Sequence, residues 1–122
     1  MANFTINVTP YGNQPPIVGD GERDTNYGEA VTLIRPDFTT NTTPPYFDPE
    51  GDLPLTLRID SLPLAGILKL NGIDIVVNQE LDFITDIDNN LFTYTPDLNQ
   101  QDAHSVNFLF SIADTGSGLF TS

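Results

Sequence analysis

Apolar and polar residues alternate along several stretches of the chain, which is typical of β-strands that bury one face. Near the N-terminus, Phe4, Ile6 and Val8 share one face, with threonine and asparagine on the other. The stretch 106–112 repeats the pattern, with valine, two phenylalanines and isoleucine at every second position. We therefore predict a strand in each stretch.

Three further strands are predicted at 29–34, 53–60 and 91–95, and a β-hairpin at 66–77. Asn71-Gly72 in the hairpin supplies the left-handed pair that a tight primed turn requires. Ten prolines and nine glycines break the chain, and no stretch has a convincing helical period. Seven or eight short strands predict an all-β antiparallel sandwich, with a small barrel as the alternative.

The stretch "TPYGNQPP" (9–16) contains three prolines and predicts a stiff linker. We therefore divide the chain into an N-terminal strand and linker at 1–12 and a β-sandwich at 13–122. The N-terminus has neither the basic nor the apolar region of a signal peptide. No apolar run approaches the roughly 20 residues of a membrane helix, so membrane insertion is not expected.

The 122-residue chain has four basic and seventeen acidic residues, which gives a formal charge of −13. Such a surface repels phosphate backbones, so a nucleic-acid partner is not expected, and it attracts cations instead. The absence of cysteine excludes disulfides, thiol catalysis and thiolate zinc sites.

The candidate catalytic chemistry is sparse, and we expect no enzyme activity. The single histidine, His104, lies in a polar stretch, and adjacent Ser105 does not form a nucleophile–base pair with it. The glycine-containing triplets at 19–21 and 116–118 lack the lysine or helix of a phosphate site. The chain has no tryptophan and its tyrosines are scattered, which argues against carbohydrate binding.

The stretch "YFDPEGDLPLTL" (46–57) carries the candidate metal chemistry. Asp48, Glu50 and Asp52 stand two residues apart, so an extended chain would place them on one face, and Gly51 would let the backbone turn. Clustered carboxylates suit calcium, which takes six to eight oxygen ligands. The alternative is a solvated turn in which the aspartates bond local amides.

An EF-hand is excluded by spacing. Counting from Asp48, the sixth position is Leu53 where glycine is needed, and the twelfth is Ile59 where glutamate is needed.

The motifs "NQPP", "DPEGD", "LPLAGILKLNG", "LFTYTPD" and "VNFLFSIADTG" follow one another between residues 13 and 114. This series resembles the cadherin-like and chondroitin-sulfate-proteoglycan-like repeats of bacterial adhesins and other surface proteins. The resemblance implies a Greek-key sandwich of cadherin-like or immunoglobulin-like type and a structural or adhesive role. It adds Asn13 and Asp114 to the predicted calcium ligands. Two departures are the missing glycine before the aromatic strand and a final strand shortened to "LFTS".

The N-terminal stretch resembles the closing strand of a preceding repeat. It would either fold back onto its own sheet or complete the sheet of a neighbour, with Phe4, Ile6 and Val8 as interaction residues. Strand exchange between copies would generate rings or filaments. Expected partners are therefore copies of this chain or neighbouring repeats, at a cell surface or on a phage virion. A small virion or filament subunit is the alternative function.

Overall fold

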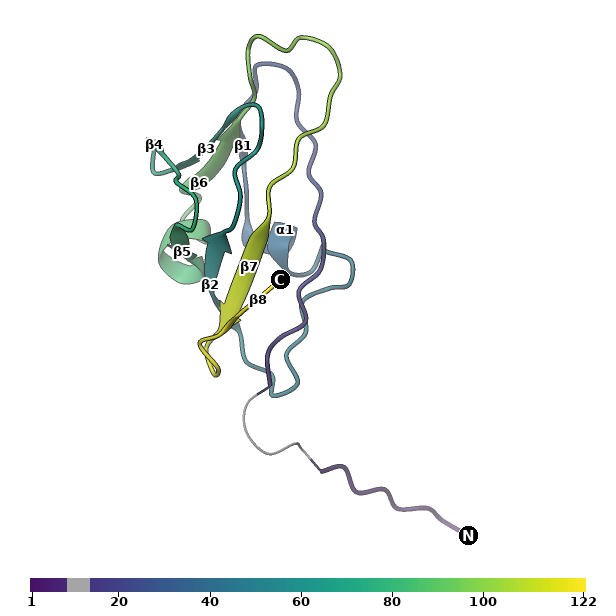
Figure 1. Cartoon of the computed structure of the whole chain (residues 1–122). Coiled ribbons are helices and arrows are strands. Elements are labelled where there is room, and N and C mark those ends of the chain that lie inside the picture. The colour runs from purple at the N-terminus through teal and green to yellow at the C-terminus, as the bar shows by residue number, and fades with distance from the viewer. Residues whose placement is uncertain (9–13) are drawn as a thin grey trace.

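The computed structural model describes residues 1–8 and 14–122, and it is an all-β sandwich of two four-stranded antiparallel sheets (Figure 1). The first sheet has the order β1-β6-β3-β4, with bounds Val31–Thr32, Phe92–Thr95, Ile67–Leu70 and Ile73–Asp74. The second has the order β5-β2-β7-β8, with bounds Glu80–Asp82, Pro54–Ile59, Phe110–Asp114 and Phe120–Thr121. The predicted fold class is confirmed, with eight strands.

The predicted hairpin is present as β3 and β4. Leu70 pairs with Ile73 across the turn, and Asn71 and Gly72 have φ values of 52° and 78°. Two positive φ values are what a two-residue primed turn needs, and this twist matches that of the strands.

Strand β2 is an inner strand of the second sheet, between β5 and β7. Its Leu57 pairs with Leu81 of β5 on one side and with Ile112 of β7 on the other. Leu57 and Ile59 are fully buried, as the alternation predicts. A register shift at the start of β2 sets Pro54 opposite Asp114 at the end of β7. This irregularity brings the C-terminal end of β7 beside the chain that enters β2.

Four phenylalanines join the two sheets through a shared ring cluster. Phe38 stacks on Phe92 of β6 at 5.8 Å between ring centroids and meets Phe110 of β7 edge-on at 5.2 Å. Phe108 contacts all three of the other rings. Each such aromatic pair adds about 0.5–1.5 kcal/mol beyond the burial of its apolar area.

Two short helical turns correct the expectation of a chain without helices. The first, α1 (Arg35–Phe38), has Pro36 in its first turn, where a missing N–H costs little. The Asp37 carboxylate accepts bonds from Ile34 N (2.9 Å) and Arg23 Nη1 (2.6 Å), which fixes this turn against the preceding segment.

The second turn, η1 (Phe83–Ile87), has π-helical geometry and follows β5. The Asp82 side chain accepts hydrogen bonds from Ile84 N (2.8 Å) and Thr85 N (2.9 Å), as a helix N-cap does. Phe83 and Ile87 are fully buried, so η1 contributes directly to the core.

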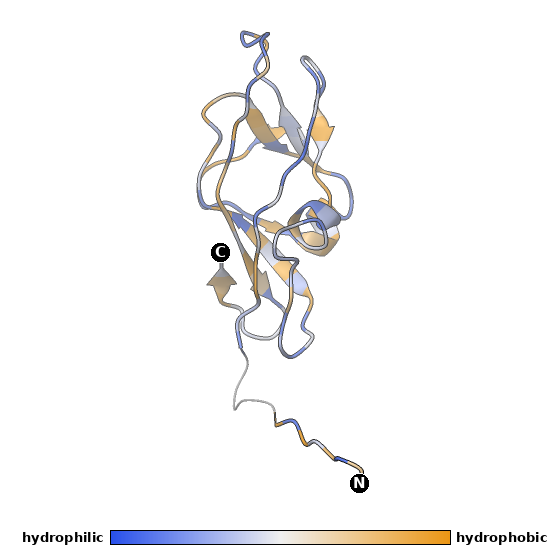
Figure 2. Cartoon of the chain, turned by 90° about the vertical axis from the view of Figure 1, so that its right-hand side faces the viewer, coloured by the Kyte–Doolittle hydropathy of each residue, from blue (hydrophilic) through white to orange (hydrophobic). Residues whose placement is uncertain are grey.

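The N-terminal stretch lies apart from both sheets. Residues 1–8 are extended and belong to no strand, and Phe4, Ile6 and Val8 are 86%, 77% and 86% exposed. Figures 1 and 2 show this segment leading away from the sandwich, with apolar and polar residues alternating along it. The structure thus does not show the fold-back alternative. No helix in the described part of the chain is long and apolar enough to cross a membrane.

Candidate metal centre

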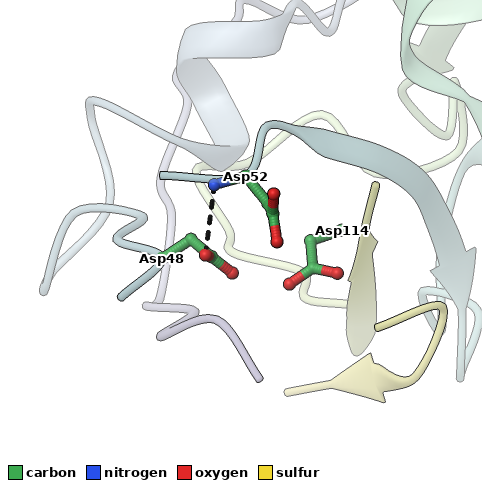
Figure 3. Close-up of side chains that lie close together, drawn as sticks. All are labelled: Asp48, Asp52 and Asp114. Atoms are coloured by element: carbon green, nitrogen blue, oxygen red, sulfur yellow. Dashed lines mark hydrogen bonds between the residues drawn. The ribbon is translucent and has the colours of Figure 1, made fainter. Parts of the chain in front are cut away.

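Three carboxylates from two distant parts of the chain meet at one end of the second sheet (Figure 3). Asp48 and Asp52 come from the loop that precedes β2, and Asp114 is the last residue of β7. One oxygen of each lies within 4.8 Å of the others. The structure therefore brings together three residues that the sequence analysis selected.

The loop of residues 48–52, called the acidic loop below, is held in shape by one oxygen of Asp48. Its Oδ1 accepts hydrogen bonds from Glu50 N (2.9 Å) and Asp52 N (3.1 Å). Gly51 takes a φ of 76°, a left-handed conformation that glycine adopts without strain. This is the local turn that the sequence analysis offered as the alternative to a metal site. It uses Oδ1 only and leaves Oδ2 for another partner.

Asp114 is held just as firmly by the turn that follows it. Its Oδ1 accepts bonds from Gly116 N (3.0 Å), Ser117 N (2.6 Å) and Ser117 Oγ (2.9 Å), and the residue is fully buried. The carboxylate is thus fixed in position, with one oxygen bonded to its own turn and the other directed elsewhere.

Three buried carboxylate oxygens receive no hydrogen bond from any described residue: Asp48 Oδ2, Glu50 Oε2 and Asp114 Oδ2. Asp48 is 6% exposed and Asp114 0%, so water screens their charges poorly. An uncompensated buried carboxylate costs several kcal/mol. Buried carboxylates that lie this close together are stabilised either by binding a proton or by binding a cation.

Glu50 connects the acidic loop to the beginning of the sandwich. Its Oε1 accepts a hydrogen bond of 2.7 Å from Gln14 N, across 36 residues of sequence. Glu50 is not one of the three clustered residues, but its other oxygen is buried at the same loop. The fifth predicted ligand, Asn13, lies outside the described residues.

The proximity of the carboxylates changes their protonation. Burial and the adjoining Asp114 raise the pKa of Asp48 above its ordinary value. Burial acts in the same direction on Asp114, but the adjoining Asp48, which is the member of the pair that takes up the proton, and the bonds from the Gly116–Ser117 turn lower the pKa of Asp114 below its ordinary value. The pair thus favours a single negative charge over two when no cation is present.

Tyr46 is a neighbour of the site that the sequence analysis did not select. Its hydroxyl donates to the carbonyl of Asp52 (3.1 Å), and burial together with the charges of Asp48 and Asp114 raises its pKa. The position of Tyr46 two residues before Asp48 was the available signal. The alternation of apolar and polar residues did not indicate a place for Tyr46 at the site, because the residues around it form a loop.

The ligand set consists of oxygen atoms, which favours hard cations over zinc or copper. Two ligands on opposite sides of one calcium ion lie roughly 4.6–5.2 Å apart, twice the usual bond length. The carboxylate oxygens of Asp48, Asp52 and Asp114 fall within that limit. The cluster is therefore able to hold a metal ion.

His104 lies away from these carboxylates. It is exposed, and its Nδ1 is 2.9 Å from the carbonyl oxygen of Asp102. The absence of enzyme activity stays a prediction.

No protein-family model, curated protein or solved structure matches the chain. The likeness to cadherin-like repeats therefore stays a prediction from the ordered motifs.

Proposed function

We propose that this chain is a non-enzymatic structural or adhesive β-sandwich module whose acidic end binds calcium. The observation that carries the proposal is a set of buried oxygens on Asp48, Glu50 and Asp114 that receive no hydrogen bond from the part of the chain that the structure describes. Asp52 supplies the further carboxylate of the cluster. Asn13 remains a proposed helper from the sequence resemblance.

The proposed role of the ion is to stiffen one end of the module. Repulsion between Asp48 and Asp114 opposes the approach of the acidic loop to β7, and a bound cation offsets it. Since Glu50 also bonds Gln14, the same loop holds the chain that enters the sandwich. Ion binding at this loop therefore stabilises the contacts among the acidic loop, the end of β7 and the chain at Gln14.

Calcium fits better than magnesium because three carboxylates converge here, whereas magnesium is usually bound through only one or two. Calcium accepts irregular shells of six to eight oxygens, whereas magnesium demands a tight octahedron and retains several waters. Water would complete the calcium shell.

The test is calorimetry and thermal unfolding of the full chain in EDTA and in calcium. We expect measurable binding heat and a melting temperature that rises with calcium concentration, since a ligand that binds only the folded state stabilises it. Asp114→Asn should abolish both effects. In EDTA the same variant should melt at or above the wild-type temperature, because it relieves the repulsion that keeps the pair from carrying two charges and it keeps the shape of the side chain.

Asp74→Asn is the matched control, since it removes the same charge from an exposed position on β4. It should retain the calcium response. Binding heat that is absent in the wild type, together with identical melting curves in calcium and EDTA, would refute the calcium site.

A second proposed role is a subunit of a filament or virion, assembled through its N-terminal segment. The exposure of Phe4, Ile6 and Val8 supports it, since three alternating apolar side chains on an unpaired extended segment are suited to strand addition. A structural module at a cell surface or on a virion is compatible with either role.

A further inference from the structure

An open groove of about 610 Å³ lies beside the ring cluster. It is lined by two segments, 21–27 and 100–108, which run toward the same end of the molecule (Figure 1). Apolar side chains from the core also line it: Val31, Leu33, Phe38, Tyr94, Phe108 and Phe110. The groove thus opens directly onto the hydrophobic core.

Both lining segments are extended but lack strand partners. Residues 21–26 and 103–109 belong to no strand or β-bridge in the described chain. Strand β8 covers β7 only at Ile112 and Ala113, so the edge does not continue along 105–110. On the opposite side, Asp60 N and Ser61 N already donate to the Leu109 carbonyl. The open edge is therefore on the side of β8.

The N-terminal segment has the properties that such an edge requires. Residues 3–8 would span about 20 Å as a strand, and so would the six acceptor residues 105–110. Its apolar residues alternate, so one face can enter the groove while the other stays in water. Residues 1–19 contain no charged side chain, although the chain as a whole has a charge of −13. The segment therefore carries no side-chain charge into an apolar groove.

We propose that residues 3–8 of one copy occupy this groove in a second copy, antiparallel to 105–110. Phe4, Ile6 and Val8 then pack over Phe108 and the core-facing side chains. The added strand continues the sheet edge where β8 stops, and it removes an unpaired edge from solvent. The contact is heterologous, since donor and acceptor are different surfaces, so repetition yields a chain of copies.

This inference rests on the second proposed role and is independent of calcium. A second copy is favoured over the chain's own segment because residues 1–8 are exposed and lead away from the groove-bearing body (Figures 1 and 2).

The test replaces Phe4 with the photoreactive analogue benzoylphenylalanine, which keeps an aromatic ring at this position. This chain is mixed with an isotopically heavy wild-type chain, irradiated in 0.15 M NaCl, and mapped by mass spectrometry. We expect light–heavy cross-links to residues 21–27 and 103–110. Sedimentation should show association that increases with protein concentration, in calcium and in EDTA.

Charge variants on the donor provide the second measurement. Ile6→Asp should weaken association at least about tenfold, since it places a charge among apolar side chains. Asn7→Asp adds the same charge to the opposite face and should have a much smaller effect. Both positions are exposed, so neither variant should disturb the fold.

Charge variants in the groove test the acceptor side of the contact. Val106→Asp alters a groove-lining side chain that is 36% exposed, whereas Val76→Asp makes the same change at a 63% exposed position outside the groove and outside 105–110. Only the first should reduce association, with unchanged circular dichroism for both variants.

Three outcomes would overturn the inference. Association with cross-links outside the groove would refute the acceptor and retain the assembly role. Cross-links within single chains only would show a folded-back segment. A monomer at all concentrations without light–heavy cross-links would refute both the inference and the assembly role, while calcium binding would stand or fall on its own calorimetry.

Discussion

Gly66 and Gly72 share a left-handed backbone conformation but differ in the space around them. Both have positive φ values, 77° and 78°. A Cβ at Gly66 would lie 2.2 Å from the Tyr94 hydroxyl oxygen and 2.7 Å from the Thr95 carbonyl oxygen, whereas a Cβ at Gly72 would meet nothing within 4 Å. The Tyr94 hydroxyl donates to the carbonyl of Ala65 (2.9 Å), so this ring cannot easily move away.

We expect Gly66→Ala to lower the free energy of unfolding by about 3–4 kcal/mol, combining left-handed strain with overpacking. Gly72→Ala should cost about 1–2 kcal/mol, from strain alone. Urea denaturation of both variants checks this difference. Equal losses would show that the close approach of Tyr94 contributes nothing to the cost.

Asp48 illustrates what the sequence could predict about the site. The two-residue spacing and the glycine selected Asp48, Glu50 and Asp52, but they left a metal site and a local turn as exclusive alternatives. In the structure, Oδ1 of Asp48 makes the turn, while Oδ2 is buried and receives no hydrogen bond from any described residue. Sequence spacing does not separate the two oxygens of one carboxylate, so this division of roles required the fold.

At the scale of elements, Arg35 joins the two helical turns. Its Nε and Nη2 contact Oδ1 and Oδ2 of Asp88 at 3.0 and 2.7 Å, which links the start of α1 to the C-cap of η1. The guanidinium also lies 5.2 Å from the centroid of the Phe83 ring. The hydrogen bonds and charge of Arg35 lower the pKa of Asp88 below its ordinary value of 3.8.

A depressed carboxyl pKa stabilises the fold above the ordinary pKa, and the effect is lost as the pH falls through the lower, folded value. We expect the Asp88 contribution to be complete above about pH 5 and to be lost progressively as the pH falls below the ordinary value of 3.8 and through the lower, folded pKa. Arg35 and Asp88 are both partly exposed, so their ion pair should contribute about 0.5–1 kcal/mol to the free energy of unfolding.

Chemical denaturation of wild type and Asp88→Asn between pH 2.5 and 7 checks this prediction. The difference in unfolding free energy should shrink at the acid end. A difference that is constant across this range would mean that the ion pair does not stabilise the fold. Asp74→Asn provides the exposed control.

The strands were easier to predict than the helical turns. Strand β2 and the hairpin follow from alternation and from Asn71-Gly72. Both α1 and η1 are shorter than two helical turns, so no 3.6-residue period can appear in the sequence. Alternation also predicted a strand through 106–109, but pairing needs a neighbour, and β8 stops at Ile112 and Ala113. The alternation of residues within 106–109 cannot show whether a neighbouring strand is present to pair with them.

For the whole molecule, the excess of acidic residues opposes folding. Four basic residues face seventeen acidic ones, and the three ion pairs of the described residues all use arginine. Screening by salt should weaken this repulsion, so we expect the melting temperature in EDTA to rise from 10 mM to 500 mM NaCl.

Calcium chloride should raise the melting temperature more than sodium chloride of equal ionic strength, because site binding adds to screening. Matched thermal scans separate the two effects. Identical curves at equal ionic strength would assign the whole calcium response to screening.

The contact between Gln14 and Glu50 has a mechanical consequence. A force applied through the N-terminal segment enters the described body at Gln14, whose N–H is bonded to the acidic loop. Directly behind it, Ile17 and Phe47 exchange two backbone hydrogen bonds of 2.6 and 3.2 Å, one residue before Asp48. Tension would therefore be borne first beside the carboxylate cluster, before any strand of either sheet. A module pulled from this end would have its resistance to extension set by the state of its acidic loop.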